Sequence, residues 1–353
     1  MTDHADLVRG LEIQAAGCAA FGSPFSAALL NHVALDIAAD GPAVGLFAPW
    51  RDATARALIE GAVPLRLLGA LHDLVLSGAV PDLAAHYPGT YGPGDSDAAW
   101  RTARSVIVDE ETRLAAFMTH EPQTNEVRRA ACLLPGFLAV SRETGLPLRC
   151  FELGASAGLN QNWDHFRYRF GAAGEWGDSG SAVGIDAEWR GGTAPPVNDV
   201  SVLSRAACDR KPVDLADPIA RRRLRSYVWA DQHDRLDRLD AAIALARAAG
   251  TTVEAEDAVT WTERRAAPSV GAATVLYHSV FWQYMPSESQ TALTKAIRAH
   301  GAAATPSAPF AWLRMEPDPV NLAHMELSLT LWPNGADRRL ARVHPHGAWV
   351  EWL

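Results

Sequence analysis

The sequence contains few cysteines and no long hydrophobic run. Its four cysteines are scattered and form no CxxC pair, which argues against a disulfide framework and a zinc cluster. No apolar stretch reaches the ~18 residues that a membrane span needs. The first ten residues, MTDHADLVRG, lack the charged-then-apolar layout of a signal peptide. These absences predict a reduced, cytoplasmic protein without a membrane partner.

Positive charge is also scarce. The chain has 41 acidic residues against 32 basic ones, a formal net charge of −9, and Lys211 and Lys295 are its only lysines. An acidic surface is a poor match for phosphate backbones, so a protein that coats nucleic acid is disfavoured. The charge balance therefore predicts a small-molecule partner and no nucleic-acid partner.

What remains is ordinary globular composition in two halves of different texture. The 353 residues are 48% hydrophobic and 21% charged, enough for more than one core. Residues 1–145 show helical spacing of apolar side chains and no alternating strand pattern. We therefore predict a helical N-terminal domain over 1–145 and a second domain over 146–353.

The second domain alternates strands with helices. The short apolar run 148–153, which ends in glycines, is typical of a buried parallel strand. Further candidate strands are Thr251–Ala255, Ala273–Val280, Phe310–Met315, Met325–Trp332 and Arg342–Trp352. This alternation predicts an α/β fold with an open sheet and crossover connections. Residues 171–197, rich in Gly, Trp and Pro, are expected to form an inserted loop or hairpin.

The most informative stretch is the turn that follows the first strand, FELGASAGLN at 151–160. Gly154 and Gly158 would let the backbone approach a ligand closely, and helix N-terminal amides can hold a carboxylate or phosphate. The same residues spell G-x-S-x-G, the nucleophile elbow of α/β-hydrolases, with Ser156 as nucleophile. A hydrolase needs strands and an oxyanion loop before the elbow, where this chain has helices. Asp257 and His346 nevertheless follow Ser156 in the order that a hydrolase triad requires, so the order of these residues does not exclude a hydrolase.

The stretch also reads E-x-G-x-S-x-G-x-N, and in this form it resembles the first motif of S-adenosylmethionine-dependent methyltransferases. The resemblance implies that the cofactor lies along this turn. The turn residues concerned are Glu152, Gly154, Ser156, Gly158 and Asn160. It also implies that Asp209, at the end of a second strand, binds the ribose hydroxyls and that Asp257, after the third, lies by the adenine. The alternative for each of these two acids is an exposed turn residue or a helix N-cap. Ser156 departs from the motif, which often has glycine there.

Several stretches together resemble a bacterial family catalogued as a domain of unknown function with a methyltransferase-like fold. They are Gln123–Arg128, the glycine turn, Tyr227–Gln232, the strand that contains His278, and His344–Gly347. The resemblance implies a Rossmann-like methyltransferase sheet preceded by the helical domain. The last two candidate strands would then form the antiparallel edge of that sheet.

The fourth strand of the sheet supplies the expected catalytic residues. The segment 273–286 ends in polar and aromatic residues, at the sheet edge where open α/β sheets bind ligands. His278 is a candidate general base because its ordinary pKa lies near neutrality, and Gln283 and Tyr284 are expected to orient a methyl acceptor. The alternative for His278 is a core histidine whose hydrogen bonds are satisfied.

Two further groups are candidates for a site. Gln123, Asn125, Glu126 and Arg128 cluster at the start of a helix that Thr124 or Asn125 would cap, and they are expected to contact substrate or to serve as a cap with surface charges. His344 and His346 share one strand face but lack a nearby third ligand. We therefore predict no metal.

These features predict an S-adenosylmethionine-dependent methyltransferase that acts on a small molecule between the two domains, with the helical domain as a lid. Two alternatives stay open. One is a hydrolase with Ser156 as nucleophile, and the other is a non-catalytic binding protein on a methyltransferase scaffold.

Overall fold

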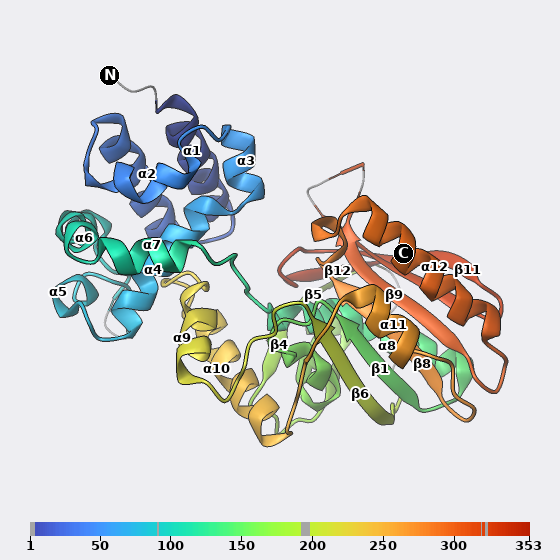
Figure 1. The fold of residues 1–353 in the computed structure, drawn as a ribbon. Coiled ribbons are helices and arrows are strands. Elements are labelled where there is room, and N and C mark those ends of the chain that lie inside the picture. The colour runs from blue at the N-terminus through green and yellow to red at the C-terminus, as the bar shows by residue number, and fades with distance from the viewer. Residues whose placement is uncertain (1–3, 90–91, 192–197, 319, 322–323) are drawn as a thin grey trace. The chain divides into compact units, whose positions relative to one another are not determined.

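The computed structural model describes residues 4–89, 92–191, 198–318, 320–321 and 324–353. The chain divides into two compact units (Figure 1). A helical unit comprises 1–124 and 216–237, and a sheet unit comprises 125–215 and 238–353. The boundary thus lies about twenty residues before the expected one at 145, and a later segment returns to the helical unit.

The helical unit is built from helices around one apolar core. Helix α4 (Val63–Leu76) has its Leu67, Leu71 and Leu74 side chains buried in the centre of that core. Within the described residues no helix of the chain is long and apolar enough to cross a membrane. The other helices of this unit are α1 (Ala5–Ala20), α2 (Pro24–Ala38), η1 (Pro42–Trp50), α3 (Ala55–Glu60), α5 (Pro81–Ala84), α6 (Ser96–Asp109), α7 (Glu111–Met118) and α9 (Pro218–Ser226), and α10 (His233–Ala248) begins in it.

The returning segment 216–237 is held in the helical unit by a polar anchor. The Ser23 hydroxyl donates to Asp231 Oδ1 at 2.5 Å, and the Phe25 amide donates to Asp231 Oδ2 at 2.9 Å. Both donors belong to the start of α2, whose first amides have no partner inside the helix. An acid 208 residues away from Ser23 therefore caps α2, in place of the Ser23 side chain itself.

The sheet unit contains a nine-stranded sheet of order β5-β12-β11-β10-β9-β8-β1-β6-β7. Strands β7, β6, β1, β8 and β9 run parallel, while β10, β11 and β12 continue the sheet as an antiparallel meander. Counted along the chain, the five parallel strands have the order 3-2-1-4-5. Their bounds are β1 (Leu148–Leu153), β6 (Val202–Asp209), β7 (Glu254–Ala255), β8 (Ala273–Ser279) and β9 (Phe310–Pro317), followed by β10 (Met325–Trp332), β11 (Ala336–Val343) and β12 (Trp349–Trp352).

The structure confirms a mixed α/β architecture whose central strands are parallel. The expected final strand over 342–352 is wrong, because this run covers the end of β11, a turn, and β12. The turn contains Gly347 with φ +75°, a conformation that ends a strand. The antiparallel edge therefore has three strands from β10 onward instead of two.

Helices cover both faces of the sheet. Tyr277 and Leu313 are register partners on one face, where α8 (Ala130–Thr144) packs, and a Cβ on Gly136 of α8 would lie 2.4 Å from Leu313. Leu276 and Trp312 point to the other face because side chains alternate along a strand. There they contact a cluster that includes residues of α11 (Ala258–Arg265) and α12 (Ser287–Ala303).

The insertion expected over 171–197 forms short strands. A small sheet joins β2 (Arg167–Arg169), β3 (Glu175–Gly177) and β4 (Gly184–Asp186). Strand β5 (Glu188–Arg190) leaves it and pairs with β12 at the edge of the main sheet. Residues 192–197 of the expected insertion lie outside the described residues.

Candidate functional site

The carboxyl ends of the parallel strands gather the candidate residues at one edge of the sheet. Strands β1 and β8 are neighbours, but β6, the next strand of this sheet along the chain after β1, lies on the other side of β1. This is the topological switch point, where open α/β sheets bind their ligands. The glycine turn 154–158 follows β1, and the loop 280–286 follows β8. Both loops therefore border the switch point.

The glycine turn adopts a left-handed backbone at three positions. Gly154, Ser156 and Gly158 have φ values of +64°, +54° and +72°. A Cβ on Gly154 would lie 2.3 Å from the ring of Phe281, so a larger residue would displace that ring. The turn thus needs glycine at 154 both for its conformation and for the close approach of the loop after β8.

Asp209 holds this turn in place. Its Oδ2 accepts from the Ser156 amide at 2.8 Å, and its Oδ1 accepts from the Lys211 amide, also at 2.8 Å. The structure therefore gives Asp209 a bracing role that the sequence did not predict. A carboxylate offers about four acceptor positions, so the ribose contact implied by the resemblance stays compatible with both bonds.

Asp257 is the N-cap of α11. Its Oδ1 accepts from the amides of Val259 at 2.9 Å and Thr260 at 3.4 Å, and its side chain is exposed. Asp and Asn are favoured at this position because they satisfy amides that have no partner in the helix. The geometry supplies a structural reason for Asp257 and adds no sign of an adenine contact.

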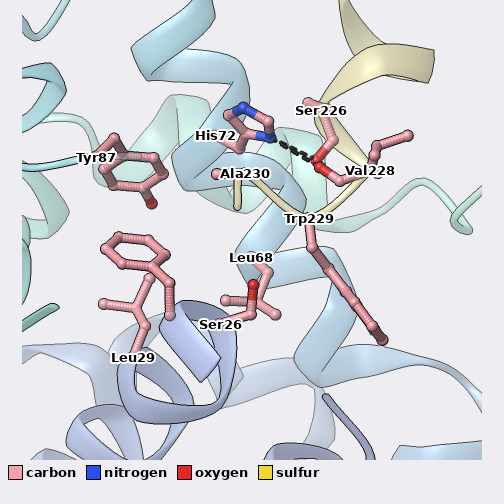
Figure 2. Close-up of a pocket in the computed structure, with 10 residues that line it drawn as sticks. Ser26, Leu29, Leu68, His72, Tyr87, Ser226, Val228, Trp229 and Ala230 are labelled. Carbon is pink, nitrogen blue, oxygen red and sulfur yellow. Dashed lines mark hydrogen bonds between the residues drawn. The ribbon is translucent and has the colours of Figure 1, made fainter. Parts of the chain in front are cut away.

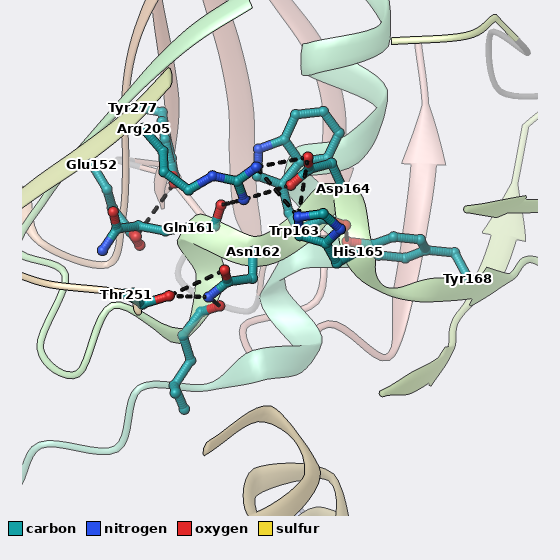
Figure 3. Close-up of polar contacts among 11 residues, drawn as sticks. Glu152, Gln161, Asn162, Trp163, Asp164, His165, Tyr168, Arg205, Thr251 and Tyr277 are labelled. Atoms are coloured by element: carbon teal, nitrogen blue, oxygen red, sulfur yellow. Dashed lines mark hydrogen bonds and ion pairs between the residues drawn. The ribbon is translucent and has the colours of Figure 1, made fainter. Parts of the chain in front are cut away.

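Glu152, the first acid of the glycine motif, is buried. It is 3% exposed, and the Tyr277 hydroxyl donates to its Oε2 at 3.3 Å (Figure 3). The pKa of Glu152 is raised to about 8, mainly by burial and to a smaller extent by the charge of Asp209, while the hydrogen bond from Tyr277 acts in the opposite direction. Glu152 is therefore an uncharged acid at neutral pH.

The segment after the glycine turn is held in place by a network of polar side chains, which Figure 3 shows together with Glu152. Arg205 of β6 forms two bonds to the carboxylate of Asp164 and a third to the carbonyl of Gln161. Asn162 and Thr251 bond each other through their side chains. These contacts hold η3 (Leu159–His165) against β6 and the segment that leads into β7.

Two buried polar atoms of the turn have no hydrogen-bond partner. They are the hydroxyl of Ser156, which is 8% exposed, and Oδ1 of Asn160, which is 2% exposed. The Asn160 Nδ2 does have a partner, since it donates to the Glu126 carbonyl at 3.2 Å. Buried polar groups are nearly always paired, so unpaired ones point to a bound water, ion or ligand.

The expected substrate residues lie at the amino end of α8, and three of them have clear structural contacts. Asn125 Oδ1 accepts from the Leu159 amide at 3.0 Å, which ties this segment to the end of the glycine turn. Glu126 caps η2 (Val127–Arg129) by accepting from the Arg128 amide at 3.1 Å. The Arg128 guanidinium donates twice to the Asp186 carbonyl, at 3.0 and 2.7 Å.

Glu126 thus caps η2, and the N-cap residue of α8 is Arg129, which makes no side-chain cap bond, so neither Thr124 nor Asn125 is the cap that the sequence predicted. Gln123 precedes it in the chain and is half-buried, and the division into units places it in the helical unit. Asn125, Glu126 and Arg128 belong to the sheet unit. The structure thus places Asn125 and Glu126 at the end of the glycine turn, whereas Arg128 bonds the carbonyl of Asp186 in the small sheet.

The histidines after β11, His344 and His346, lie close to Glu126. His346 Nδ1 lies 3.7 Å from Glu126 Oε2, and the His346 amide donates to His344 Nδ1 at 3.0 Å. Burial, together with the nearby His346 and Arg128, lowers the pKa of His344 to about 4. In the part of the chain that the structure describes, no group of three His, Cys, Asp or Glu side chains could hold a metal ion.

His278 lies inside the sheet with both ring nitrogens engaged. It is fully buried, and Trp312 Nε1 donates to its Nε2 at 3.1 Å. Because an indole N–H only donates, Nε2 must carry the lone pair and Nδ1 the proton. His278 Nδ1 then donates to Glu316 Oε1 at 2.6 Å. This geometry leaves no ring nitrogen for a substrate proton, and it matches the alternative of a satisfied core histidine.

The other two expected catalytic residues are on the surface of the loop after β8. Gln283 and Tyr284 lie in η5 (Trp282–Tyr284), and both are exposed, Tyr284 by 70%. Their exposure leaves them accessible to a small molecule at this edge. The structure does not bring them into contact with the His278 ring, which is buried beneath the loop.

The structure adds one residue to the site, Glu316 at the end of β9. Its Oε1 accepts from His278 and also from the amides of Phe281 at 3.0 Å and Trp282 at 3.2 Å. Its Oε2 is buried without a partner. The sequence could have indicated Glu316, because it lies at the end of a candidate buried strand, and this is the pattern that drew attention to Asp209 and Asp257.

A small cavity lies inside the helical unit (Figure 2). His72 Nδ1 lies 3.1 Å from the carbonyls of Ser226 and Val228, and the buried Tyr87 hydroxyl has no partner. The cavity has room for about one water. The segment 227–232, one of the stretches with family resemblance, supplies part of its wall and thus has a packing role in this unit.

The comparisons with known proteins assign the chain to a family. The sequence profile of a family described as "uncharacterized protein conserved in bacteria (DUF2332)" matches residues 9–352. The chain therefore belongs to this bacterial family over nearly its whole length. None of the curated proteins and none of the solved structures matched.

Proposed function

We propose that the protein is an S-adenosylmethionine-dependent methyltransferase that acts on a small molecule. The observation that carries the proposal is the position of the glycine turn. It follows the first strand of a 3-2-1-4-5 parallel order and borders the switch point, which is the ligand-binding place of doubly wound sheets. A Rossmann-like methyltransferase sheet is the fold that this order supports best.

The turn itself has features that fit the cofactor. The unpaired Ser156 hydroxyl and Asn160 Oδ1 offer a donor and an acceptor on one short segment. Asp209 holds the Ser156 amide and still has acceptor capacity. Asp257 is assigned to its helix cap and left out of the cofactor contacts. The residues proposed to hold the cofactor are therefore Glu152, Gly154, Ser156, Gly158, Asn160 and Asp209.

The bound cofactor would supply an activated methyl group, so the protein's task is mainly to position the acceptor. Glu152 is uncharged at neutral pH and would interact with the cofactor as a hydrogen-bonding group. His278 is a positioning residue, because it orients Glu316 and through it the loop 280–286. Gln283 and Tyr284 would contact the acceptor from that loop.

The test is calorimetric binding of S-adenosylmethionine and S-adenosylhomocysteine. We expect the wild type to bind at least one of them, and Ser156→Ala to weaken binding roughly three- to tenfold through one lost neutral hydrogen bond. Ser307→Ala is the matched control, since Ser307 lies before β9 at the opposite edge of the sheet. No heat from either nucleoside at millimolar concentration would contradict the proposal.

The hydrolase alternative makes a different prediction. A fluorophosphonate probe should label Ser156, and Ser156→Ala should abolish the label. The structure offers this alternative little support, since the Ser156 hydroxyl has no partner and a nucleophilic serine needs a base within hydrogen-bond reach. A binding protein without catalysis on the same scaffold would give neither nucleoside binding nor labelling.

A further inference from the structure

The carboxylate of Glu316 is unevenly paired. Oε1 accepts three hydrogen bonds, from His278 Nδ1 and from the amides of Phe281 and Trp282. Oε2 accepts none, although it is buried. A buried acceptor without a partner has lost its water and gained no donor in return, which is unfavourable, and more so for a charged group. A donor from a ligand would remove this cost.

The charge around Glu316 also favours a cation. Glu326 of β10 is its register partner in the antiparallel pair, so both acids lie on one face of the sheet. Arg339 balances Glu326 with an ion pair of 2.6 Å. The histidine bonded to Glu316 is neutral in this arrangement, as the donor from Trp312 requires. Of the two acids, Glu316 is thus the one that a ligand cation can balance.

Aromatic rings pack around His278, the histidine that bonds this carboxylate. The ring of Trp282 stacks on His278 with centroids 5.5 Å apart and meets Trp312 at 5.6 Å. Ring faces attract cations and repel anions. Trp312 already carries one cation, the guanidinium of Arg314 at 4.1 Å from its centroid, and that guanidinium is paired with Asp337. The surroundings therefore suit a positively charged group with an apolar body.

The loop beside Glu316 is strained. Val280 has φ +53°, a conformation that β-branched residues rarely adopt, and its amide donates to the Met315 carbonyl at 2.9 Å. Strain of this kind clusters at ligand clamps and active sites. Two residues of the loop, Gln283 and Tyr284, are exposed, and the Glu316 side chain is itself 17% exposed, so the loop lies between the carboxylate and the surface.

We propose that Glu316 and the rings of Trp282 and Trp312 form a binding site for an amine, with Oε2 accepting an N–H of the ligand's ammonium group. The amine enters at the loop 280–286. Its role as the methyl acceptor rests on the proposed function, whereas amine binding does not, so the two are tested separately. The other occupant that suits a lone buried oxygen is a water molecule.

The experiment compares three small probes of the same chain length, n-butylamine, n-butanol and butyrate, at neutral pH. Binding is followed by the NMR signals of the indole N–H groups, with those of Trp282 and Trp312 assigned from single substitutions to Phe. We expect a saturable shift with n-butylamine and none with the other two. Glu316→Gln keeps an oxygen for the three donors, and we expect it to weaken amine binding roughly tenfold or more.

Two controls make the outcome decisive. Glu351→Gln removes an acid of the same unit that is paired with Arg342, and it should leave amine binding unchanged. Trp282→Leu keeps the carboxylate but removes a ring, and it should weaken binding severalfold; it also serves if Glu316→Gln does not fold. Equal shifts with n-butanol, no saturable shift, or full binding by both Glu316→Gln and Trp282→Leu would overturn the proposal.

Calorimetry with S-adenosylhomocysteine on the same proteins separates the two proposals. We expect Glu316→Gln to retain nucleoside binding while it loses amine binding. Amine binding without any nucleoside binding would leave the amine site standing and contradict the methyltransferase. Nucleoside binding without amine binding would leave the methyltransferase proposal standing and contradict the amine site. A water molecule would then occupy the place beside Oε2.

Discussion

Replacing Glu152 by glutamine should stabilise the sheet unit, and increasingly so as the pH rises. Burial is the main cause that raises the pKa of Glu152 from 4.5 to about 8. Between these two values the folded chain holds a proton on Glu152 that the unfolded chain has released. Glutamine has nearly the same shape, stays uncharged, and can still accept the hydrogen bond from Tyr277.

The sign and size follow from proton linkage. A group whose pKa is raised by folding stabilises the fold fully below its unfolded pKa, and this contribution is lost as the pH rises through the folded value. Each unit of pKa difference corresponds to about 1.36 kcal/mol. At pH 7 the carboxyl of Glu152 therefore destabilises the fold by about 3 kcal/mol relative to pH 4.5. Glu152→Gln should remove this amount.

The assay is denaturant unfolding of wild type and variant at pH 5, 6, 7 and 8. The difference in unfolding free energy should grow from about 1 kcal/mol at pH 5 to about 3 kcal/mol at pH 7. Glu143→Gln is the control, because Glu143 is a partly exposed acid of the same unit, paired with Arg338 at 2.8 Å. A constant difference between pH 5 and 8 would refute the reasoning, since it would mean that Glu152 is ionised throughout in the folded chain.

Two further predictions concern the helical unit. Burial lowers the pKa of His72 to about 4, so this unit should lose stability as the pH falls from 6.5 to 4, by up to about 3 kcal/mol, and His72→Asn should flatten that loss in thermal unfolding. Asp231→Ala removes the acceptor for the Ser23 hydroxyl and the Phe25 amide, and should cost about 2 kcal/mol, with Asp231→Asn in between. Unchanged denaturation midpoints in both Asp231 variants would show that α2 does not need this cap.

The sequence predicted the elements whose signal is local. The first strand at 148–153, the glycine turn and the strand at 325–332 were found at the expected residues, because a buried apolar run and a glycine pair are visible without knowing their neighbours. The parallel centre of the sheet followed from the alternation of strands and helices. The strands after β10 were harder to predict. The first four residues of β11 are exposed and show no apolar alternation, and β12 has only four residues, so it differs little from a turn.

The division of the chain was set by distant contacts. Residues 216–237 have an ordinary amphipathic pattern, and the pattern does not tell which core they join. In the structure these residues join the core of the helical unit, where Asp231 accepts a hydrogen bond from Ser23 at the start of α2. The expected boundary at 145 had a similar cause: α8 looks like the helices before it, but its Phe137 packs against Tyr277 of the sheet.

The same limit applied to the candidate site. The order of Glu152, Asp209 and Asp257 behind the strands could be predicted, but the groups that each acid bonds could not. Asp257 bonds the amides two and three residues later, so its cap was a local possibility. The bond between His278 and Glu316 joins residues 38 apart, so the sequence did not reveal it. Because of this bond, His278 positions Glu316 and does not act as a general base.

The pairing of each acid separates structural from ligand-binding roles at this edge of the sheet. Asp209 uses both oxygens to hold backbone amides, and Asp257 caps a helix. Glu152 avoids an unpaired charge by keeping its proton. Glu316 alone among these four combines three donors on one oxygen with a buried, unpaired second oxygen. Buried acceptors are normally paired, so the unpaired Oε2 makes Glu316 the acid at this edge that is best suited to bind a ligand.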